Sequence, residues 1–227
     1  MIVLGLDTAT PATVVGLRLA DGRTLQARDY PAPGARPAHL TRLLELAAEL
    51  LEQAGLGWGE LERIAVGLGP GTFTGLRIGV ASARGLSQSL GVELVGVSTL
   101  RTLAEAAPAG GVLAVLDARR GEAFAAAYAG GRELLEARAL APADLGGLLE
   151  QAEAAAPGRP WLAVGDGAIR FRAELQAAGA QVPPDAAELH QVSGAAICAL
   201  GACAPEQSLQ TVVPDYRRRP DAEVALA

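Results

Sequence analysis

The sequence predicts an α/β protein built from two related lobes. An apolar strand that ends in aspartate occurs twice, as Leu6-Asp7-Thr8 and as Leu116-Asp117-Ala118, and each copy leads into a turn and further strands. Helical and strand patterns alternate elsewhere, and half of the residues are apolar, which is enough for a sizeable core. The best boundary is Ala109-Gly110-Gly111. We therefore expect lobes at residues 1–108 and 109–227, the second one reduced.

The first lobe is expected to begin with three strands, at 2–6, 13–19 and 23–30, and Asp21-Gly22 is a strong hairpin signal between the last two. Leucines at helical spacing predict a helix from His39 to Ala54, with Gly55 as its stop. Leu46 falls among polar residues of this helix, so it is expected to be exposed and available to a partner.

The rest of the first lobe is expected to contain two strands and two helices. A strand at 63–68 precedes a glycine-rich loop, and a helix should run from Phe73 to Leu90. Small residues recur at every fourth position of that helix, which lets another helix approach its backbone closely; they are Gly75, Gly79 and Ala83. A strand at 92–97 and a helix capped by Ser98 follow.

The second lobe is expected to carry strands at 112–116, 123–128, 132–140 and 161–164. Helices are predicted to open at Pro142 and to lie near 168–178 and 186–202.

Composition excludes several classes of function. The formal net charge is −6, so the chain has no basic field to attract nucleic acid, and any role with RNA needs a basic partner. Lysine is absent, which removes the phosphate-binding lysine of a P-loop and all Schiff-base chemistry. No leader pattern or long apolar run is present, so we expect a cytoplasmic protein without a membrane span. Cys198 and Cys203 are expected to be buried free thiols.

Asp7 and Asp117 allow two interpretations. Paired aspartates of this kind hold Mg²⁺ against phosphate across the cleft of two-lobed nucleotide-binding proteins. Alternatively, each carboxylate accepts backbone N–H bonds in its own turn. Thr8-Ala9-Thr10 and Ala118-Arg119-Arg120 are bulkier than a phosphate hairpin usually tolerates, which favours the second interpretation.

The loop Gly67-Leu68-Gly69-Pro70-Gly71-Thr72, between a strand and a helix, also has two interpretations. It lacks the lysine of a P-loop and the spacing of a dinucleotide loop, yet a glycine-rich loop at a helix N-terminus can hold an anion. The alternative is a tight turn, with Thr72 as the N-cap in either case. Candidate nucleotide or anion contacts are Asp7, Thr8, Gly69, Gly71, Thr72, Asp117 and Arg119.

Other catalytic chemistry finds little support. His39 and His190 have no ligand partners at helical spacing, so a surface or capping role is expected for both and no metal site is predicted. No nucleophile elbow surrounds a serine.

Several motifs resemble the TsaB family of tRNA threonylcarbamoyladenosine biosynthesis proteins, formerly grouped with glycoprotease-like proteins. They are Gly5–Thr10, Gly69–Gly79, Asp117–Glu122 and Val213–Arg217, and the similarity spans nearly the whole chain. The segment Gly69–Gly79 is the most specific of them. Phe124 stands where a tyrosine is common in the family.

The resemblance implies an actin-like ATPase fold (ASKHA, ribonuclease H-like) with a reduced second lobe. It implies a non-catalytic scaffold subunit that binds and activates TsaD, which transfers threonylcarbamoyl to adenosine next to the anticodon of tRNAs. The ATPase TsaE joins the complex, and tRNA is reached only through it. TsaD has two metal-binding histidines at positions matched here by Thr99 and Leu103, so the peptidase label is unsupported. No cofactor is required, although weak ATP or ADP binding is allowed.

Family members associate through two helices of the first lobe, which map to His39–Ala54 and Phe73–Leu90. The resemblance thus implies one patch for a homodimer of the isolated chain and for the heterodimer with TsaD. Its residues are predicted to be Leu43, Leu46, Leu50, Gly75, Gly79 and Ala83. The alternative is that both helices only cover their own sheet. The competing function is an autonomous actin-fold ATPase or kinase that uses Asp7 and Asp117, and a metallopeptidase is a weaker third.

Overall fold

The computed structural model describes residues 1–32, 34–108 and 110–217, which form two compact units. The first unit contains Met1–Thr102 and Val192–Asp215; the second contains Leu103–Gln191 and the segment from Tyr216. The expected boundary residue Ala109 lies outside the described residues. Assigning all of 109–227 to the second lobe was wrong, because residues 192–215 return to the first unit and pack on its sheet.

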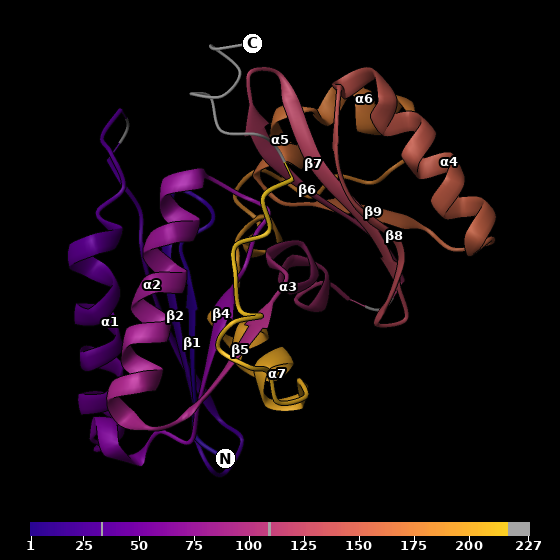
Figure 1. The fold of residues 1–227 in the computed structure, drawn as a ribbon. Helices are drawn as coiled ribbons and strands as arrows, with labels where there is room; N and C mark the ends of the chain where they lie inside the picture. Colours follow the sequence, from indigo (N-terminus) through magenta and orange to yellow (C-terminus); the bar gives the residue numbers. More distant parts are fainter. Residues whose placement is uncertain (33, 109, 218–227) are drawn as a thin grey trace. The chain divides into compact units, whose positions relative to one another are not determined.

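The first unit is built on a five-stranded mixed sheet with the order β3-β2-β1-β4-β5 (Figure 1). The meander β1–β2–β3 is antiparallel, and β4 and β5 are added parallel to β1. The strands are β1 Val3–Asp7, β2 Thr13–Arg18, β3 Thr24–Asp29, β4 Arg63–Gly67 and β5 Glu93–Val97.

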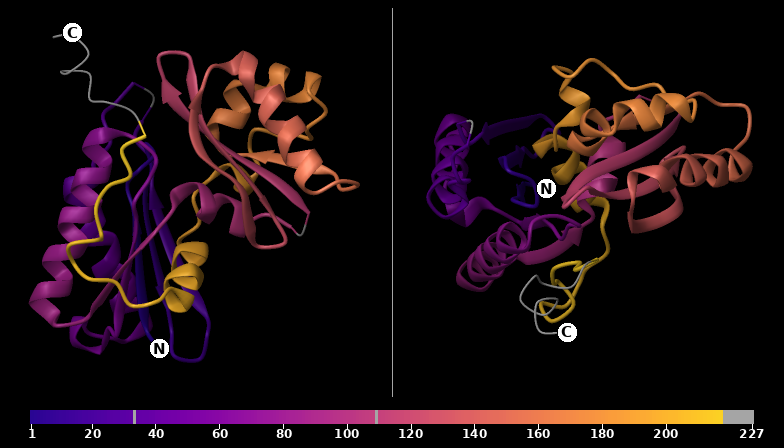
Figure 2. Two further views of the ribbon diagram at one scale, coloured as in Figure 1. Left: turned by 45° about the vertical axis from the view of Figure 1, so that its right-hand side comes forward. Right: turned by 90° about the horizontal axis from the view of Figure 1, so that it is seen from above.

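Helices cover both faces of this sheet. The side chains of Leu4 and Leu6 join a core with α1 (His39–Ala54) and α2 (Phe73–Leu90), which lie side by side (Figure 1). Because side chains alternate along a strand, Gly5 faces the opposite side. There α7 (Gly194–Cys203) packs on β1, β2 and β4, as the left view of Figure 2 shows in orange-yellow. The short helix η1 (Trp58–Glu60) precedes β4.

Glycines allow α7 to lie close to the sheet. A Cβ on Gly16 would lie 2.2 Å from the carbonyl oxygen of Gly194, and one on Gly5 would lie 2.9 Å from Sγ of Cys198. A Cβ on Gly201 would lie 2.3 Å from Cβ of Ala65. The helix and the strands therefore meet almost backbone to backbone.

Polar contacts hold the returning segment in place. Nη1 of Arg63 donates to the carbonyl oxygens of Gly201 (2.9 Å) and Ala204 (2.8 Å) at the end of α7. The side-chain amide of Gln207 pairs with the backbone N–H and C=O of Gly96 on β5 (3.0 and 3.4 Å). Since β5 is an edge strand, Gln207 satisfies backbone groups that would otherwise be open.

The second unit repeats the first sheet without its fifth strand. The order β8-β7-β6-β9 combines an antiparallel meander with one parallel strand, as β3-β2-β1-β4 does. This confirms the predicted duplication and the reduced second lobe. The strands are β6 Gly111–Arg119, β7 Glu122–Ala129, β8 Arg132–Leu140 and β9 Trp161–Val164.

Helices of the second unit are short, and α4, α5 and α6 share one core with its sheet. They are α3 Thr99–Glu105, which spans the division between the units, η2 Pro142–Asp144, α4 Leu145–Ala155, α5 Asp166–Arg170, α6 Arg172–Ala177 and η3 Glu188–His190. Most predicted elements are present, but the helix expected at 186–202 begins only at Gly194. None of the described helices is long and apolar enough to cross a membrane.

Candidate functional site

Asp7 ends β1 and is completely buried in the first unit. Its Oδ2 accepts a hydrogen bond from Oγ1 of Thr99 at 2.7 Å, and its Oδ1 accepts one from the backbone N–H of Ala9 at 2.8 Å. Burial raises the pKa of Asp7 to about 6, although both hydrogen bonds act in the opposite direction.

The sheet leaves no room beside this carboxyl group. Gly67, at the end of β4, lies against it, and a Cβ on Gly67 would lie 1.8 Å from Oδ2 of Asp7. The prediction that Asp7 contacts a nucleotide was therefore wrong for this conformation. The alternative interpretation, a carboxylate that accepts bonds near its own turn, describes it correctly.

Thr8 and the glycines of α2 form a close helix-on-strand contact. Oγ1 of Thr8 donates to the carbonyl oxygen of Gly75 at 2.7 Å. A Cβ on Gly75 would lie 1.9 Å from the backbone oxygen of Thr8, and one on Gly79 would lie 2.4 Å from its Oγ1. Thr8 is buried, so it too is not an accessible ligand contact. The small-residue stripe of α2 serves contact with its own strand.

The loop before α2 packs on the β1–β2 turn. Gly69 has φ +105°, the Gly69–Pro70 bond is cis, and a Cβ on Gly71 would lie 2.4 Å from the carbonyl oxygen of Ala9. The backbone N–H of Thr72 donates to that same oxygen at 2.8 Å. Thr72 occupies the N-cap position of α2, but its side chain makes no capping hydrogen bond. These contacts favour the tight-turn interpretation.

Burial of residues in α1 and α2 also corrects the predicted partner surface. All six residues predicted for it are buried within the first unit, Leu46 at 3% exposure: Leu43, Leu46, Leu50, Gly75, Gly79 and Ala83. A different side of α1 is exposed to solvent. Leu40 is 77% exposed and Leu44 is 43% exposed, and Ala48 follows them one turn later. Spacing alone did not identify this side, because leucines lie on both faces of α1.

On α2, the exposed positions include Ala81 and Gly85. We use the term outer helical face for Leu40, Leu44 and Ala48 of α1 together with these two residues of α2. Each of these five residues is small or apolar. The other exposed residues of α1 include Glu45, Glu49 and Glu52.

Asp117 lies two residues before the end of β6, the corresponding strand of the second unit, and is bound by its own neighbours. Oδ1 accepts from the backbone N–H of Arg119 at 2.9 Å, and Oδ2 accepts from Nη1 of Arg170 at 2.9 Å and of Arg119 at 3.4 Å. The Asp117 side chain is only 8% exposed. Of the predicted contacts in this unit, only Arg119, at 57%, is open to solvent.

A second carboxyl group supports this arrangement. Oδ1 of Asp166 on α5 accepts from the backbone N–H of Asp117 at 2.9 Å. Burial, and secondarily the charge of Asp117, raise the pKa of Asp166. A Cβ on Gly167 would lie 2.7 Å from the backbone carbon of Leu116, so the absence of a side chain there allows α5 to approach β6.

A surface or capping role was expected for both histidines, and both are buried. Nδ1 of His39 lies 2.9 Å from Oγ1 of Thr13, and burial lowers the His39 pKa despite the nearby charge of Asp29. Nδ1 and Nε2 of His190 lie 3.0 and 3.2 Å from the carbonyl oxygens of Gly165 and Pro183. In the described part of the chain, no three His, Cys, Asp or Glu side chains gather in a way that could hold a metal ion.

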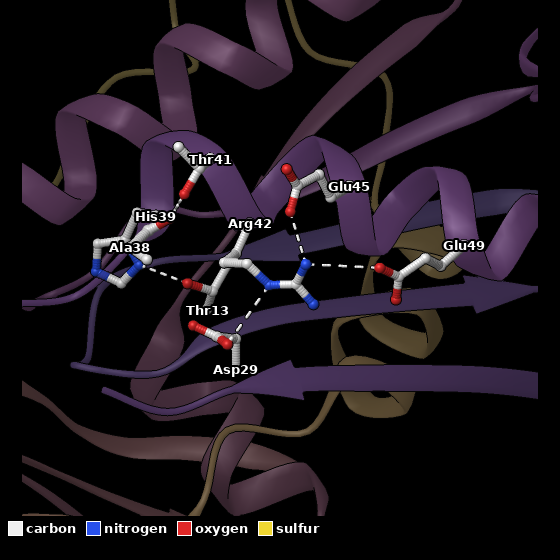
Figure 3. A network of polar contacts seen from close by, with 8 residues as sticks. All are labelled: Thr13, Asp29, Ala38, His39, Thr41, Arg42, Glu45 and Glu49. Atoms are coloured by element: carbon white, nitrogen blue, oxygen red, sulfur yellow. Dashed lines mark hydrogen bonds and ion pairs between the residues drawn. The ribbon is translucent and has the colours of Figure 1, made fainter. Parts of the chain in front are cut away.

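Figure 3 shows the polar contacts around His39 at the start of α1. The Arg42 guanidinium lies 3.5 Å from Asp29 of β3, 2.6 Å from Glu45 and 3.6 Å from Glu49. The pair with Asp29 joins α1 to the edge strand β3, whereas Glu45 and Glu49 lie on α1 itself. Of the two cysteines, both free, Cys198 is buried as expected, but Cys203 is exposed.

The duplicated sheets define an actin-like ATPase fold. The ROK hexokinase of Thermus thermophilus superposes with a TM-score of 0.52 at 15% identity, covering 87% of this chain and 98% of the hexokinase. YeaZ from Pseudomonas aeruginosa superposes with a TM-score of 0.74 at 27% identity, covering 95% of this chain and 99% of that chain.

Sequence comparison identifies the family. A family model described as TsaD, tRNA N6-adenosine threonylcarbamoyltransferase, matches residues 32–226. The Escherichia coli (strain K12) tRNA threonylcarbamoyladenosine biosynthesis protein TsaB is 39% identical over 132 residues, which are 56% of this chain and 55% of the relative. The chain belongs to the family of this model, and it is similar to the TsaB proteins. The aligned region spans little more than half of the curated relative.

Proposed function

We propose that this chain is a non-catalytic scaffold subunit of the bacterial complex that transfers threonylcarbamoyl to adenosine next to the anticodon of tRNAs. Its role is to bind and activate TsaD. Similarity to the TsaB proteins supports the tRNA modification role. The observation that carries the non-catalytic role is the burial of Asp7, whose carboxyl group is occupied by Thr99 and Ala9.

The residues after β5 support the same proposal. Thr99 and Leu103 of α3 stand where the resemblance places the metal-binding histidines of TsaD. Neither a hydroxyl group nor an aliphatic side chain replaces imidazole as a ligand at this spacing. Thr99 is instead a donor to Asp7, and Leu103 is buried.

The proposed docking surface for TsaD is the outer helical face. Leu40 and Leu44 lie one helical turn apart and are among the few exposed large apolar side chains of the described chain. Ala81 and Gly85 on the neighbouring helix permit close approach of another helix. Apolar side chains exposed together are typical of protein interfaces.

The remaining components follow from this role. We propose that the same face forms a homodimer when the chain is isolated, that TsaE joins the heterodimer, and that tRNA is bound only by the complex, in the cytoplasm. No cofactor is required for scaffolding, and any ATP or ADP binding by this chain alone is weak.

The alternative function is an autonomous ATPase or kinase that uses Asp7 and Asp117. It requires both carboxylates to be accessible to a magnesium nucleotide. Asp7 is fully buried, and Asp117 is paired with Arg170 and Arg119. Titration calorimetry of the isolated chain with Mg-ATP tests this alternative; micromolar binding with hydrolysis would favour it.

Reconstitution tests the proposal directly. Purified TsaD, TsaE, threonylcarbamoyl-adenylate and tRNA should give modified adenosine efficiently only when this chain is present. Equal modification without the chain would overturn the proposed function. Modification by this chain in the absence of TsaD would show that it is itself the catalyst.

A further inference from the structure

The turn between β6 and β7 holds two consecutive arginines in the left-handed backbone region. Arg119 has φ +65° and Arg120 has φ +53°, and Gly121 follows at φ +79°. For residues other than glycine and asparagine, this conformation costs about 1–2 kcal/mol of conformational free energy. Because Arg119 pairs with Glu122, Arg120 and Gly121 are the central residues of the hairpin, where Asn-Gly is the favoured pair.

The protein holds this unfavourable turn with a dedicated set of contacts. Asp117 accepts from the backbone N–H of Arg119 and binds Arg170, while Asp166 accepts from the backbone N–H of Asp117. These bonds join the turn to α5. Neither a simple hairpin nor a solvent-exposed loop needs arginine at positions 119 and 120. The side chains of Arg119 and Arg120 therefore distinguish this turn from an ordinary hairpin.

The guanidinium groups of this turn face solvent, whereas the carboxyl groups lie behind them. The Arg119 and Arg170 side chains are 57% and 48% exposed, Arg120 is also exposed, and Asp117 is 8% exposed. The other charged groups nearby are Glu122 and Asp166, and burial favours the neutral form of Asp166 by raising its pKa. Arg119, Arg120 and Arg170 thus present guanidinium groups on the solvent side of this turn, with the Asp117 and Asp166 carboxyl groups behind them, in a chain whose formal net charge is −6.

We propose that Arg119, Arg120 and Arg170 form a contact for backbone phosphates of RNA. The planar guanidinium group donates two parallel hydrogen bonds to a phosphate, and a rigid turn fixes the direction of the groups that it carries. This inference rests on the proposed function, in which the partner supplies most of the tRNA affinity and this chain adds a local contact.

The test uses the assembled complex with TsaD and TsaE and the double variant Arg119→Asn/Arg120→Asn. Asparagine tolerates the left-handed region, and the resulting Asn-Gly pair is the preferred turn, so the folded structure should be kept. Arg132→Asn/Arg159→Asn is the matched control, since it removes two exposed arginines from elsewhere in the same unit, one at the start of β8 and one before β9.

Binding of labelled tRNA is measured over a range of salt concentrations, alongside urea unfolding of each variant. We expect the turn variant to bind tRNA about 5-fold or more weakly, with the salt slope lower by about one to two, and the control to behave as the wild type. Unchanged tRNA affinity with unchanged or raised stability would overturn the inference, because the arginines would then be dispensable. So would an equal loss in the control variant, which would indicate a general charge effect.

Two further measurements distinguish a failure of the RNA contact from a failure of the proposed function. If the wild-type chain does not assemble with TsaD, the proposed function itself fails. If the turn variant assembles and binds tRNA normally but loses binding of a fluorescent ATP analogue, the phosphate belongs to a nucleotide, and the RNA contact is refuted.

Discussion

Oγ1 of Thr99 donates a 2.7 Å hydrogen bond to Oδ2 of Asp7, and neither side chain reaches solvent. The bond joins the end of β1 to the first residue of α3. It places a carboxyl group where the surroundings favour its neutral form, with two hydrogen-bond donors and no cation bonded to it among the described residues. This arrangement is suited to joining elements and poorly suited to holding Mg²⁺.

Asp7 should make folding stability depend on pH in a defined direction. Its pKa is about 6 in the folded protein against an ordinary value of 3.8, so the folded state binds the proton more tightly. Its contribution to the unfolding free energy is therefore greatest below about pH 4, falls as the pH rises toward about 6, and is level above that. The difference between these two pKa values corresponds to about 3 kcal/mol of unfolding free energy.

The variant Asp7→Asn removes this titration. Relative to the wild type, its unfolding free energy should rise by up to about 3 kcal/mol between about pH 4 and 7, because the amide carries no charge to bury. Urea unfolding at several pH values measures this difference. Asp21→Asn is the control, since Asp21 is exposed and its pKa is lowered by Arg23. A difference that stays flat or falls with pH would refute the assignment.

The α2 glycines provide a second prediction. Gly75→Ala and Gly79→Ala should each destabilise the protein by about 1–3 kcal/mol, because a Cβ at either site would overlap Thr8. Gly85→Ala should instead stabilise it by about 0.5–1 kcal/mol, since Gly85 is helical and no atom lies within 4 Å of its ideal Cβ position. Thermal and urea unfolding of the three variants would compare them, and a loss at Gly85 equal to that at Gly79 would contradict the packing described here.

The sequence was sufficient to predict the fold class but not the side of α1 that faces outward. Strand–Asp–turn repeats and the Asp21-Gly22 hairpin are local, so they predicted the two meanders correctly. Leu40 and Leu44 fit the helical spacing and Leu46 falls on the other side, yet Leu46 is buried and the other two are exposed, because the position of the sheet decides which side is covered. The glycine stripe of α2 is equally compatible with a strand or with another molecule as its neighbour.

The return of α7 to the first unit could not be predicted from sequence, because it depends on contacts between residues far apart. Gly16 and Gly194 meet only in the folded chain, and neither position is unusual by itself. Burial of Asp7 likewise depends on Gly67, at the end of β4, and on Thr99, at the start of α3. Patterns in the local sequence do not show which distant residues become neighbours in the folded chain.

Arg63 should be the main polar anchor of the returning segment. Its guanidinium donates to two carbonyl oxygens at the end of α7 and also binds Glu93. Arg63→Met keeps most of the aliphatic length but leaves both carbonyl groups without this donor, which should cost about 2–4 kcal/mol of unfolding free energy. Arg23→Met, which removes an ion pair with exposed Asp21, should change the unfolding free energy by less than about 0.5 kcal/mol. Equal effects in urea unfolding would argue against an anchoring role.

The partner surface yields the most discriminating pair of variants, Leu44→Arg and Leu46→Arg. Leu44 is 43% exposed, so an arginine there should leave stability within about 0.5 kcal/mol of the wild type while weakening TsaD binding and activation at least ~10-fold. Leu46 is 3% exposed, so an arginine there places a charge in the core and should unfold or strongly destabilise the chain.

Circular dichroism and urea unfolding establish which variant folds, and calorimetry with TsaD then measures binding for the folded one. Gln53→Arg is the control, because it introduces the same side chain on α1 at an exposed position that is not on the row of Leu40, Leu44 and Ala48. A Leu44→Arg variant that is folded and binds TsaD as tightly as the wild type would place the partner surface elsewhere. A Leu46→Arg variant that is fully stable would mean that α1 is rotated relative to its sheet, and both the outer helical face and the burial that defines it would have to be abandoned.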